Sequence, residues 1–258
     1  MPSIPGEPGK DWKTEVLLSG SWRNATSLLL TNGSYRLVID TGMPHEEHLL
    51  VNALRQHGLS TSDIDAIINT HFHIDHVLNN SLFVRSAIYA TQESHDWCCS
   101  LYSDLLDTQR WEKLILKYYP QTLEYDHAVE HLHQMRKFTL RWWDRKRLGH
   151  SSQHHWLESH SLPEGLNLYL TSGHVPGHVS VIVPEQEQTT VVAGDACLSR
   201  YEDVRVLTMI PRDREQARLD RRQVLALGTR IFPGHDVEFT INGNGGSEGL
   251  QPNPSQGQ

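Results

Sequence analysis

The chain has 258 residues, and 23 lysines and arginines against 31 aspartates and glutamates give it a formal net charge of −8. This charge argues against a global electrostatic attraction to nucleic acid or to an anionic membrane. With 38% hydrophobic and 21% charged residues, the composition fits one globular domain over residues 1–258 and not a disordered chain. The unusual number is the 17 histidines, because histidine is the commonest metal ligand and a frequent general base.

The cysteine content and the hydropathy bear on the cellular compartment. Three cysteines are too few for a disulfide framework, and two of them, Cys98 and Cys99, are adjacent. No stretch stays apolar over 18 residues, and the proline- and glycine-rich first ten residues do not resemble a signal peptide. We therefore expect a cytoplasmic protein with reduced thiols and no membrane contact.

The first part of the chain has the pattern of several strands and one helix. Short apolar and β-branched runs separated by turn residues predict strands, and the Asn32-Gly33 pair predicts a hairpin. Apolar residues at helical spacing then predict a helix that ends before Gly58. The predicted strands are 16–19, 26–30, 35–39 and 65–69, and the predicted helix is 46–57.

Residues 97–160 differ in composition from the rest of the chain, since they hold five of the seven tryptophans and seven of the histidines. We expect them to form a helical insertion that serves as a lid or as a homodimer surface. Six basic residues fall between positions 136 and 147, around Trp142-Trp143. Aromatic and basic residues mixed in this way are typical of a nucleic-acid groove. The interpretation we prefer is a solvated helix face whose tryptophans pack inward.

The last part of the chain returns to short apolar runs. They predict strands at 166–170, 179–183, 189–193 and 230–232, with a charged amphipathic helix at 212–227. Residues 242–258 are rich in glycine, proline, asparagine and serine, so we expect a flexible tail there.

Directly after the predicted strand 65–69, three imidazoles and one carboxylate fall within six residues: His71, His73, Asp75 and His76. On an extended segment His71 and His73 point to the same side, and a turn into a helix lets the next two polar residues face a second point nearby. A metal-free cluster of this kind would leave buried polar atoms without hydrogen bonds. The pattern therefore predicts a metal site.

Three further ligand-type side chains follow predicted strands in the same way, each beside a glycine. His174 comes after strand 166–170, Asp195 after strand 189–193, and His235 after the last strand. Strand ends are rigid, and glycine lets the backbone turn sharply, so short side chains can be brought to one point. We expect these residues to complete the metal site.

The order of these motifs, HxHxDH, GHxPGH, GD and PGH, resembles the metallo-β-lactamase superfamily of hydrolases from about residue 16 to residue 239. The resemblance implies an α/β fold, the αββα sandwich, with two metal ions at one edge. His178, the second histidine of GHxPGH, is given a supporting role and not a ligand role. The implied ligands are His71, His73 and His174 for one ion and Asp75, His76 and His235 for the other, with Asp195 bridging the two.

Zinc is the expected metal, two ions per chain, although ligand sets of histidine and carboxylate also serve iron and manganese. Asp40, which follows the predicted strand 35–39, has two readings of equal weight. Its carboxylate either steadies a ligand histidine or caps a turn.

Departures from the superfamily pattern separate its subgroups. Flavodiiron proteins have glutamate where His73 stands, and most zinc β-lactamases have cysteine or serine where Asp195 stands, so β-lactam hydrolysis is the less favoured activity. Residues 77–80 read VLNN where many relatives continue with a glycine pair. The GHxPGHxS spacing and residues 234–238 are similar to acyl-homoserine lactonases and glyoxalase II. Residues 82–83, 94–97 and 191–195 are similar to a small animal branch for which RNA cleavage has been proposed.

We therefore expect a zinc-dependent hydrolase in which metal-bound hydroxide attacks a small-molecule acyl bond, namely a lactone, an ester or a thioester. In this mechanism Asp75 accepts the liberated proton, and Tyr201 donates a hydrogen bond to the oxyanion. The alternative is a metal-dependent nuclease acting on RNA or DNA, with the basic residues of 136–147 on the phosphates. A third hypothesis is a metal-binding protein whose site is sealed by the aromatic insertion.

Overall fold

The computed structural model describes residues 12–107, 111–120, 125–186, 188–201 and 211–241. The predicted tail, 242–258, lies outside the described residues. Among the helices that the described ranges contain, none has the length and hydropathy needed to cross a membrane.

The first sheet is built from the N-terminal strands. Its order is β1-β2-β3-β4-β5-β6, with antiparallel pairing from β1 to β3 and parallel pairing from β3 to β6. Both faces of its central strands are buried, which explains their nearly continuous apolar sequences. The strands are β1 (Lys13–Leu18), β2 (Ser27–Thr31), β3 (Arg36–Ile39), β4 (Ala66–Ile68), β5 (Ala87–Ala90) and β6 (His154–Trp156).

The second sheet is built from the C-terminal strands in the order β11-β10-β9-β8-β7, and its only parallel pair among the described strands is β9 with β10. The strands are β7 (Asn167–Leu170), β8 (Val179–Pro184), β9 (Thr189–Gly194), β10 (Arg230–Pro233) and β11 (Phe239–Thr240). Every predicted strand overlaps an observed one. The sequence did not predict β11, which has two residues and shows no alternation.

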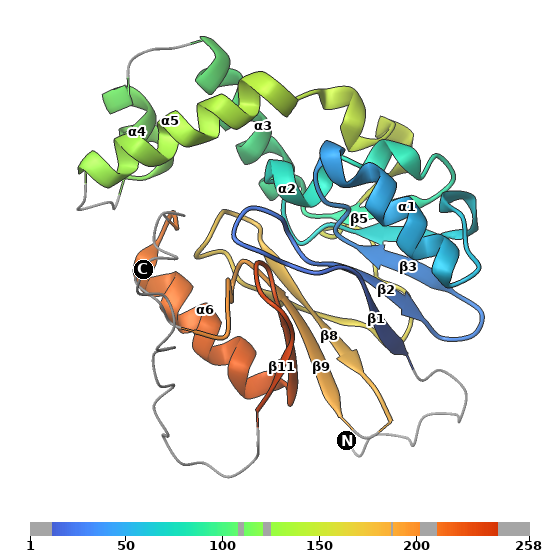
Figure 1. Ribbon diagram of the computed structural model, residues 1–258. Coiled ribbons are helices and arrows are strands. Elements are labelled where there is room, and N and C mark those ends of the chain that lie inside the picture. The colour runs from blue at the N-terminus through green and yellow to red at the C-terminus, as the bar shows by residue number, and fades with distance from the viewer. Residues whose placement is uncertain (1–11, 108–110, 121–124, 187, 202–210, 242–258) are drawn as a thin grey trace, which may run out of the picture.

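The two sheets pack face to face, with one helix on each outer surface (Figure 1). Leu28, Ile39 and Ile68 of the first sheet share an apolar core with Val181 and Phe232 of the second. Helix α1 (Glu47–Gln56) covers the first sheet through Leu50 and Leu54. Helix α6 (Arg214–Leu227) covers the second sheet through Val224. The four layers confirm the predicted αββα sandwich.

The segment 97–160 contains helices, and its end joins the first sheet. The helices are α3 (Gln92–Asp107), α4 (Trp111–Tyr118) and α5 (Tyr125–Trp142), followed by 3₁₀ turns η4 (Arg145–Leu148) and η5 (Ser151–Gln153). Helix α3 begins five residues before the predicted boundary. Residues 154–156 are not helical, since they form β6 and pair in parallel with β5. The sequence HHW is too short to have shown strand periodicity.

Short elements complete the described fold. They are the 3₁₀ turns η1 (Pro44–Glu46), η2 (Thr61–Asp63) and η3 (Asn80–Leu82), and the single-turn helix α2 (Ile74–Val77). Helix α2 follows β4 directly and carries part of the HxHxDH motif.

Candidate metal centre

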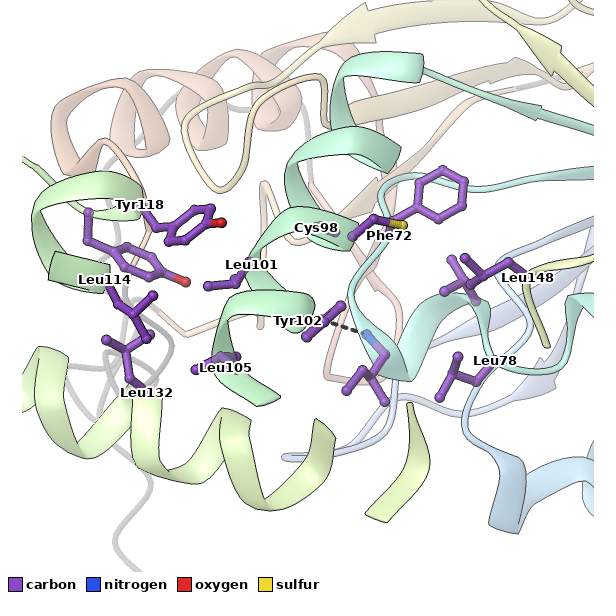
Figure 2. Close-up of a cluster of buried hydrophobic side chains, with 14 of the residues drawn as sticks. Phe72, Leu78, Cys98, Leu101, Tyr102, Leu105, Leu114, Tyr118, Leu132 and Leu148 are labelled. Atoms are coloured by element: carbon purple, nitrogen blue, oxygen red, sulfur yellow. Dashed lines mark hydrogen bonds between the residues drawn. The ribbon is translucent and has the colours of Figure 1, made fainter. Parts of the chain in front are cut away.

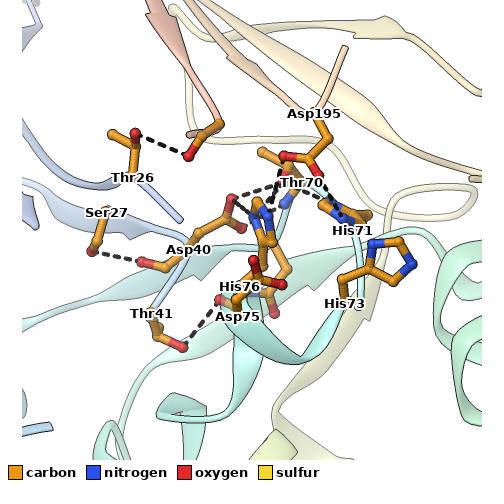
Figure 3. A network of polar contacts seen from close by, with 12 residues as sticks. Thr26, Ser27, Asp40, Thr41, Thr70, His71, His73, Asp75, His76 and Asp195 are labelled. Atoms are coloured by element: carbon orange, nitrogen blue, oxygen red, sulfur yellow. Dashed lines mark hydrogen bonds and ion pairs between the residues drawn. The ribbon is translucent and has the colours of Figure 1, made fainter. Parts of the chain in front are cut away.

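The first ligand-type segment leaves the end of β4 and turns into α2, with His73 as the residue that precedes the helix. This puts His71 on extended backbone and Asp75 and His76 on the first helical turn. Thr70, His71 and His76 are buried. The His71 and His76 side chains face Asp195, which comes from the second sheet (Figure 3). The motif therefore lies where the two sheets meet at one edge.

The carboxylate of Asp195 is shared between two sets of histidines. Its Oδ2 lies 3.1 Å from His174 Nε2 and 3.8 Å from His71 Nε2. Its Oδ1 lies 3.3 Å from His76 Nε2 and 3.3 Å from His235 Nε2. Because each oxygen faces a different set, this side chain is placed to bridge two cations.

The remaining two ligand-type residues extend the two sets. His73 Nδ1 lies 3.0 Å from His174 Nε2, and Asp75 Oδ2 lies 3.5 Å from His235 Nε2. In each set the candidate ligand atoms lie within 4.8 Å of one another. All seven residues expected from the sequence are thus brought together, in two groups: His71, His73, His174 and Asp195, and Asp75, His76 and His235.

Hydrogen bonds on the far ring nitrogens fix how three of these histidines point. His76 Nδ1 donates to Asp40 Oδ2 at 2.7 Å, and His235 Nδ1 donates to the Ser21 carbonyl at 2.9 Å. The Thr70 hydroxyl donates to Asp40, so it accepts from His71 Nδ1 at 3.1 Å. With Nδ1 protonated, the lone pair of each Nε2 is directed into the centre.

Asp40 is thus a partner of a ligand-type histidine, which decides between its two readings. It also accepts the backbone N–H of Thr70, and it is the only non-glycine residue with positive φ among those described. This φ of 54° is a backbone conformation that costs energy, and the three hydrogen bonds to the carboxylate hold it.

Buried atoms without partners test whether the centre suits metal ions. Nε2 of His71, His76 and His235 and Oδ1 of Asp195 are buried and have no hydrogen-bond partner, and the same holds for Nε2 of His73. Leaving several such atoms unpaired would be costly, whereas divalent cations would satisfy them. Imidazole and carboxylate donors in this number fit two divalent ions such as zinc, iron or manganese.

The electrostatics of the two groups differ. Burial lowers the pKa of His71 and of His73 well below the ordinary histidine value. Burial also acts to lower the pKa of His76, but the carboxylates of Asp195, Asp40 and Asp75 outweigh it and raise that pKa well above the ordinary value. His71 and His73 are therefore ready to bind a cation as neutral imidazoles, while a cation bound by His76 must displace a proton.

His178 lies outside both groups and supports Asp195. The Asp195 backbone N–H donates to His178 Nε2 at 3.0 Å, and His178 Nδ1 donates to the Thr171 hydroxyl at 2.7 Å. A Cβ on Gly194 would lie 2.8 Å from His178 Nε2, so only glycine allows the ring this close to the backbone. His178 thus sets the position of the bridging carboxylate through its main chain.

This buried neutral ring predicts a pH effect on stability. Burial lowers the pKa of His178 to about 3, whereas the unfolded chain takes up the proton near pH 6.5. Between these values the unfolded state binds more protons, so the free energy of unfolding falls as the pH is lowered. Chemical denaturation of the metal-free protein at several pH values gives the slope of the unfolding free energy against pH. Between about pH 3 and 6.5 this slope is expected to be smaller in His178→Gln than in the wild type, by up to about 1.4 kcal/mol per pH unit. Identical slopes would contradict a neutral His178.

Tyr201, the expected oxyanion donor, is not part of either group. Its backbone exchanges hydrogen bonds with the Ser199 side chain, its ring lies 5.9 Å from the Arg200 guanidinium carbon, and 39% of its surface is exposed. Its role in oxyanion stabilisation stays a prediction.

Some residues of the centre left no usable signal in the sequence. Ser21 acts through its carbonyl, which any residue could provide. Glu46 is buried and accepts the Met43 backbone N–H; burial raises its carboxyl pKa. Thr70 stands next to His71, two residues after the end of β4, and Asp40 stands one residue after the end of the neighbouring β3, so their strand-end positions were a signal available in the sequence.

Comparison with known proteins agrees with this geometry. The profile of the metallo-β-lactamase superfamily matches residues 20–235. Metallo-beta-lactamase domain-containing protein 1 of Xenopus laevis is 23% identical over 91% of this chain and 84% of its own length, and the chain spans 59% of the human homologue. A stretch of 55 residues is 38% identical to a metallo-hydrolase of Methanocaldococcus jannaschii, over 21% of this chain and 27% of that protein.

Solved structures share the fold. A metallo-β-lactamase-type protein of Thermotoga maritima superposes with a TM-score of 0.58 at 16% identity, covering 90% of this chain and all of that one. AidC, a dizinc quorum-quenching lactonase solved with its product, superposes with a TM-score of 0.52 at 19% identity, covering 88% and 85%. The matched profile spans most of the chain and includes every ligand-type residue described above. The chain therefore belongs to the metallo-β-lactamase superfamily of metal-dependent hydrolases.

Proposed function

We propose that the protein is a zinc-dependent hydrolase that cleaves an acyl bond in a small apolar molecule, such as a lactone, an ester or a thioester. The observation that carries this proposal is the aromatic surroundings of the first ligand group. The Trp97 ring of α3 lies 6.4 Å from the His73 ring and is only partly buried. An apolar side chain beside a polar centre favours an apolar substrate with one reactive polar bond.

The aromatic surroundings continue along α5. Residues 131, 135, 138 and 142 follow the spacing that puts them on one helix face. His131 and Met135 contact Tyr119, whose ring lies 6.0 Å from Trp97. Phe138 lies under the guanidinium of Arg23, two residues beyond the Ser21 carbonyl that holds His235. This mostly apolar face of α5 thus extends from beside the first group toward the second.

Three of the six basic residues of α5 and η4 make contacts away from the ligand groups, which counts against the nuclease alternative. The Arg136 side chain donates to the Leu105 carbonyl of α3 at 2.9 Å. Arg147 pairs with Glu47 of α1 at 3.8 Å, and Arg141 lies over the Trp142 ring. None of these three contacts is with a residue of the ligand groups, so a phosphate-binding role for this run has less support than apolar recognition.

The proposed chemistry divides between the ions and the chain. Two bound zinc ions would supply Lewis acidity, which lowers the pKa of a water molecule and polarises an acyl carbonyl. Asp195 would hold the two ions together, with its orientation fixed by His178. Asp75 is the more open of the two ligand carboxylates, at 18% side-chain exposure against 1% for Asp195, and we assign it the proton released in the reaction. The structural likeness to a dizinc lactonase supports this assignment of reaction class.

Metal removal and a substrate panel test the proposal. The protein is stripped with a chelator, reloaded with Zn²⁺, and assayed against lactones, thioesters, β-lactams and single-stranded RNA. Hydrolysis of a lactone or thioester is expected, with complete loss on chelation and recovery when Zn²⁺ is returned. Acyl hydrolysis that persists in the stripped protein would contradict the zinc mechanism. RNA cleavage without acyl hydrolysis would establish the nuclease alternative.

A further inference from the structure

We propose that helix α3 of the insertion is the element that positions the HxHxDH ligands, so that metal binding and the folding of the insertion stabilise each other. This differs from the lid or homodimer surface expected from the sequence. The proposal rests on the proposed function only in requiring that the centre binds a metal.

Successive side chains of residues 71–74 point alternately into the metal centre and into the core of the insertion. His71 and His73 point into the centre, while the intervening Phe72 and the following Ile74 are buried in the hydrophobic cluster that α3, α4 and α5 form. Phe72, Tyr102, Leu105 and Leu132 are seen in this cluster in Figure 2. On extended backbone, successive side chains point to opposite sides, so burial of Phe72 in the insertion determines where its neighbours point.

The backbone between the ligands is also held by α3. The Phe72 N–H donates to the Ser94 hydroxyl at 3.1 Å. The Ile74 N–H donates to the Tyr102 hydroxyl at 3.0 Å, the bond drawn as a dashed line in Figure 2. Ser94 and Tyr102 are 0% and 1% exposed, so water cannot replace either bond. They are eight residues apart on one helix face, and the two amides they bind flank His73.

The N-terminal end of α3 also contacts the segment that carries His174. The Thr91 hydroxyl, one residue before α3, donates to the Gly177 carbonyl at 2.5 Å. A Cβ on Gly177 would lie 2.5 Å from that hydroxyl and 2.8 Å from the Ser94 backbone nitrogen. Gly177 lies three residues after His174 and directly before His178. Thus α3 and the residue before it fix backbone that carries ligands of both segments.

Two consequences follow from these contacts. Loss of either α3 hydroxyl leaves a buried N–H unpaired and loosens the backbone on one side of His73, which lowers metal affinity. Conversely, an ion that holds His71 and His73 also holds Phe72 and Ile74 in the insertion core, so metal binding stabilises α3.

The test compares Tyr102→Phe and Ser94→Ala with the matched control Tyr118→Phe. Tyr118 lies in the same cluster, and its hydroxyl contacts Ser100 and Asp104 and not the ligand segment. Zn²⁺ affinity is measured by competition with a chromogenic chelator, and amide hydrogen exchange is followed in segments 71–76 and 92–107 with and without Zn²⁺. We expect about tenfold weaker Zn²⁺ binding in Tyr102→Phe and in Ser94→Ala, and wild-type affinity in Tyr118→Phe.

Hydrogen exchange separates a positioning role from a general loss of stability. In the wild type, Zn²⁺ is expected to slow exchange in segment 92–107 as well as in 71–76. In Tyr102→Phe, the slowing of exchange in 92–107 is expected to be smaller. Unchanged affinity in both α3 variants would overturn the proposal, as would Zn²⁺ protection confined to 71–76 in the wild type. If the wild type binds no Zn²⁺, the proposed function itself has failed.

Discussion

Replacing Asp195 with asparagine is expected to lower kcat/KM by about 10³-fold, equivalent to about 4 kcal/mol of lost transition-state stabilisation. The substitution preserves shape but removes the charge that two sets of histidines share at 3.1–3.8 Å. Without this carboxylate two cations would repel each other across the centre. Metal analysis is therefore expected to find one bound ion per chain in place of two.

The matched control for this substitution is Asp96→Asn. The Asp96 side chain is 63% exposed and pairs with His95, so its loss is expected to leave kcat/KM and metal content unchanged. Two ions and full activity in Asp195→Asn would show that the two histidine sets do not depend on a shared carboxylate.

Gly234→Ala is expected to lower kcat/KM by about 10²-fold, although the side chain adds only a methyl group. A Cβ at this position would lie 2.1 Å from Asp195 Oδ1. The backbone cannot move away easily, because the Gly234 N–H donates to the Gly194 and Cys197 carbonyls and its own carbonyl accepts from Thr26. The Asp195 carboxylate must therefore shift, and a displacement of about 1 Å can cost this much rate. Steady-state kinetics and metal content measure the effect.

Gly58→Ala provides the opposite case to Gly234→Ala. Gly58 has a φ of +72° and no atom within 4 Å of the added Cβ, so the substitution strains the backbone without crowding anything. It is expected to lower the free energy of unfolding by about 1 kcal/mol and to leave kcat/KM unchanged. If Gly234→Ala lowered the free energy of unfolding but kept full kcat/KM, the result would contradict a displacement of the Asp195 carboxylate by the added methyl group.

Much of the fold and the centre was predictable because the relevant signals are local. The apolar runs of β2, β3 and β4 alternate with turn residues, and ligand-type side chains follow the ends of β4, β7, β9 and β10, with a glycine beside them after the last three. Strand ends are rigid, so short side chains placed there can meet at one point, and the order of the motifs resembles a known superfamily. This is why His71, Asp195 and His235 were expected together although they lie far apart in sequence and come from two different sheets.

What the sequence could not predict depends on contacts made by generic groups. The Ser21 carbonyl that holds His235 is main chain, and the Tyr102 hydroxyl that holds Ile74 belongs to an ordinary aromatic in a helical pattern. The end of the segment 97–160 was predicted as helix and forms β6, because three residues carry too little periodicity. The homodimer through this segment stays a prediction.

The parallel pairing of β5 with β6 has a consequence for how this protein could vary or be redesigned. Two parallel neighbours run in the same direction, so the chain that leaves Ala90 must travel back along the sheet before it can enter His154. A tight turn cannot make that return. The return needs roughly a dozen or more residues and is commonly made by a helix. Residues 91–153 are thus a crossover that could be exchanged for another helical connection but not excised, so a chain joined directly from 90 to 154 would lose the edge of its first sheet.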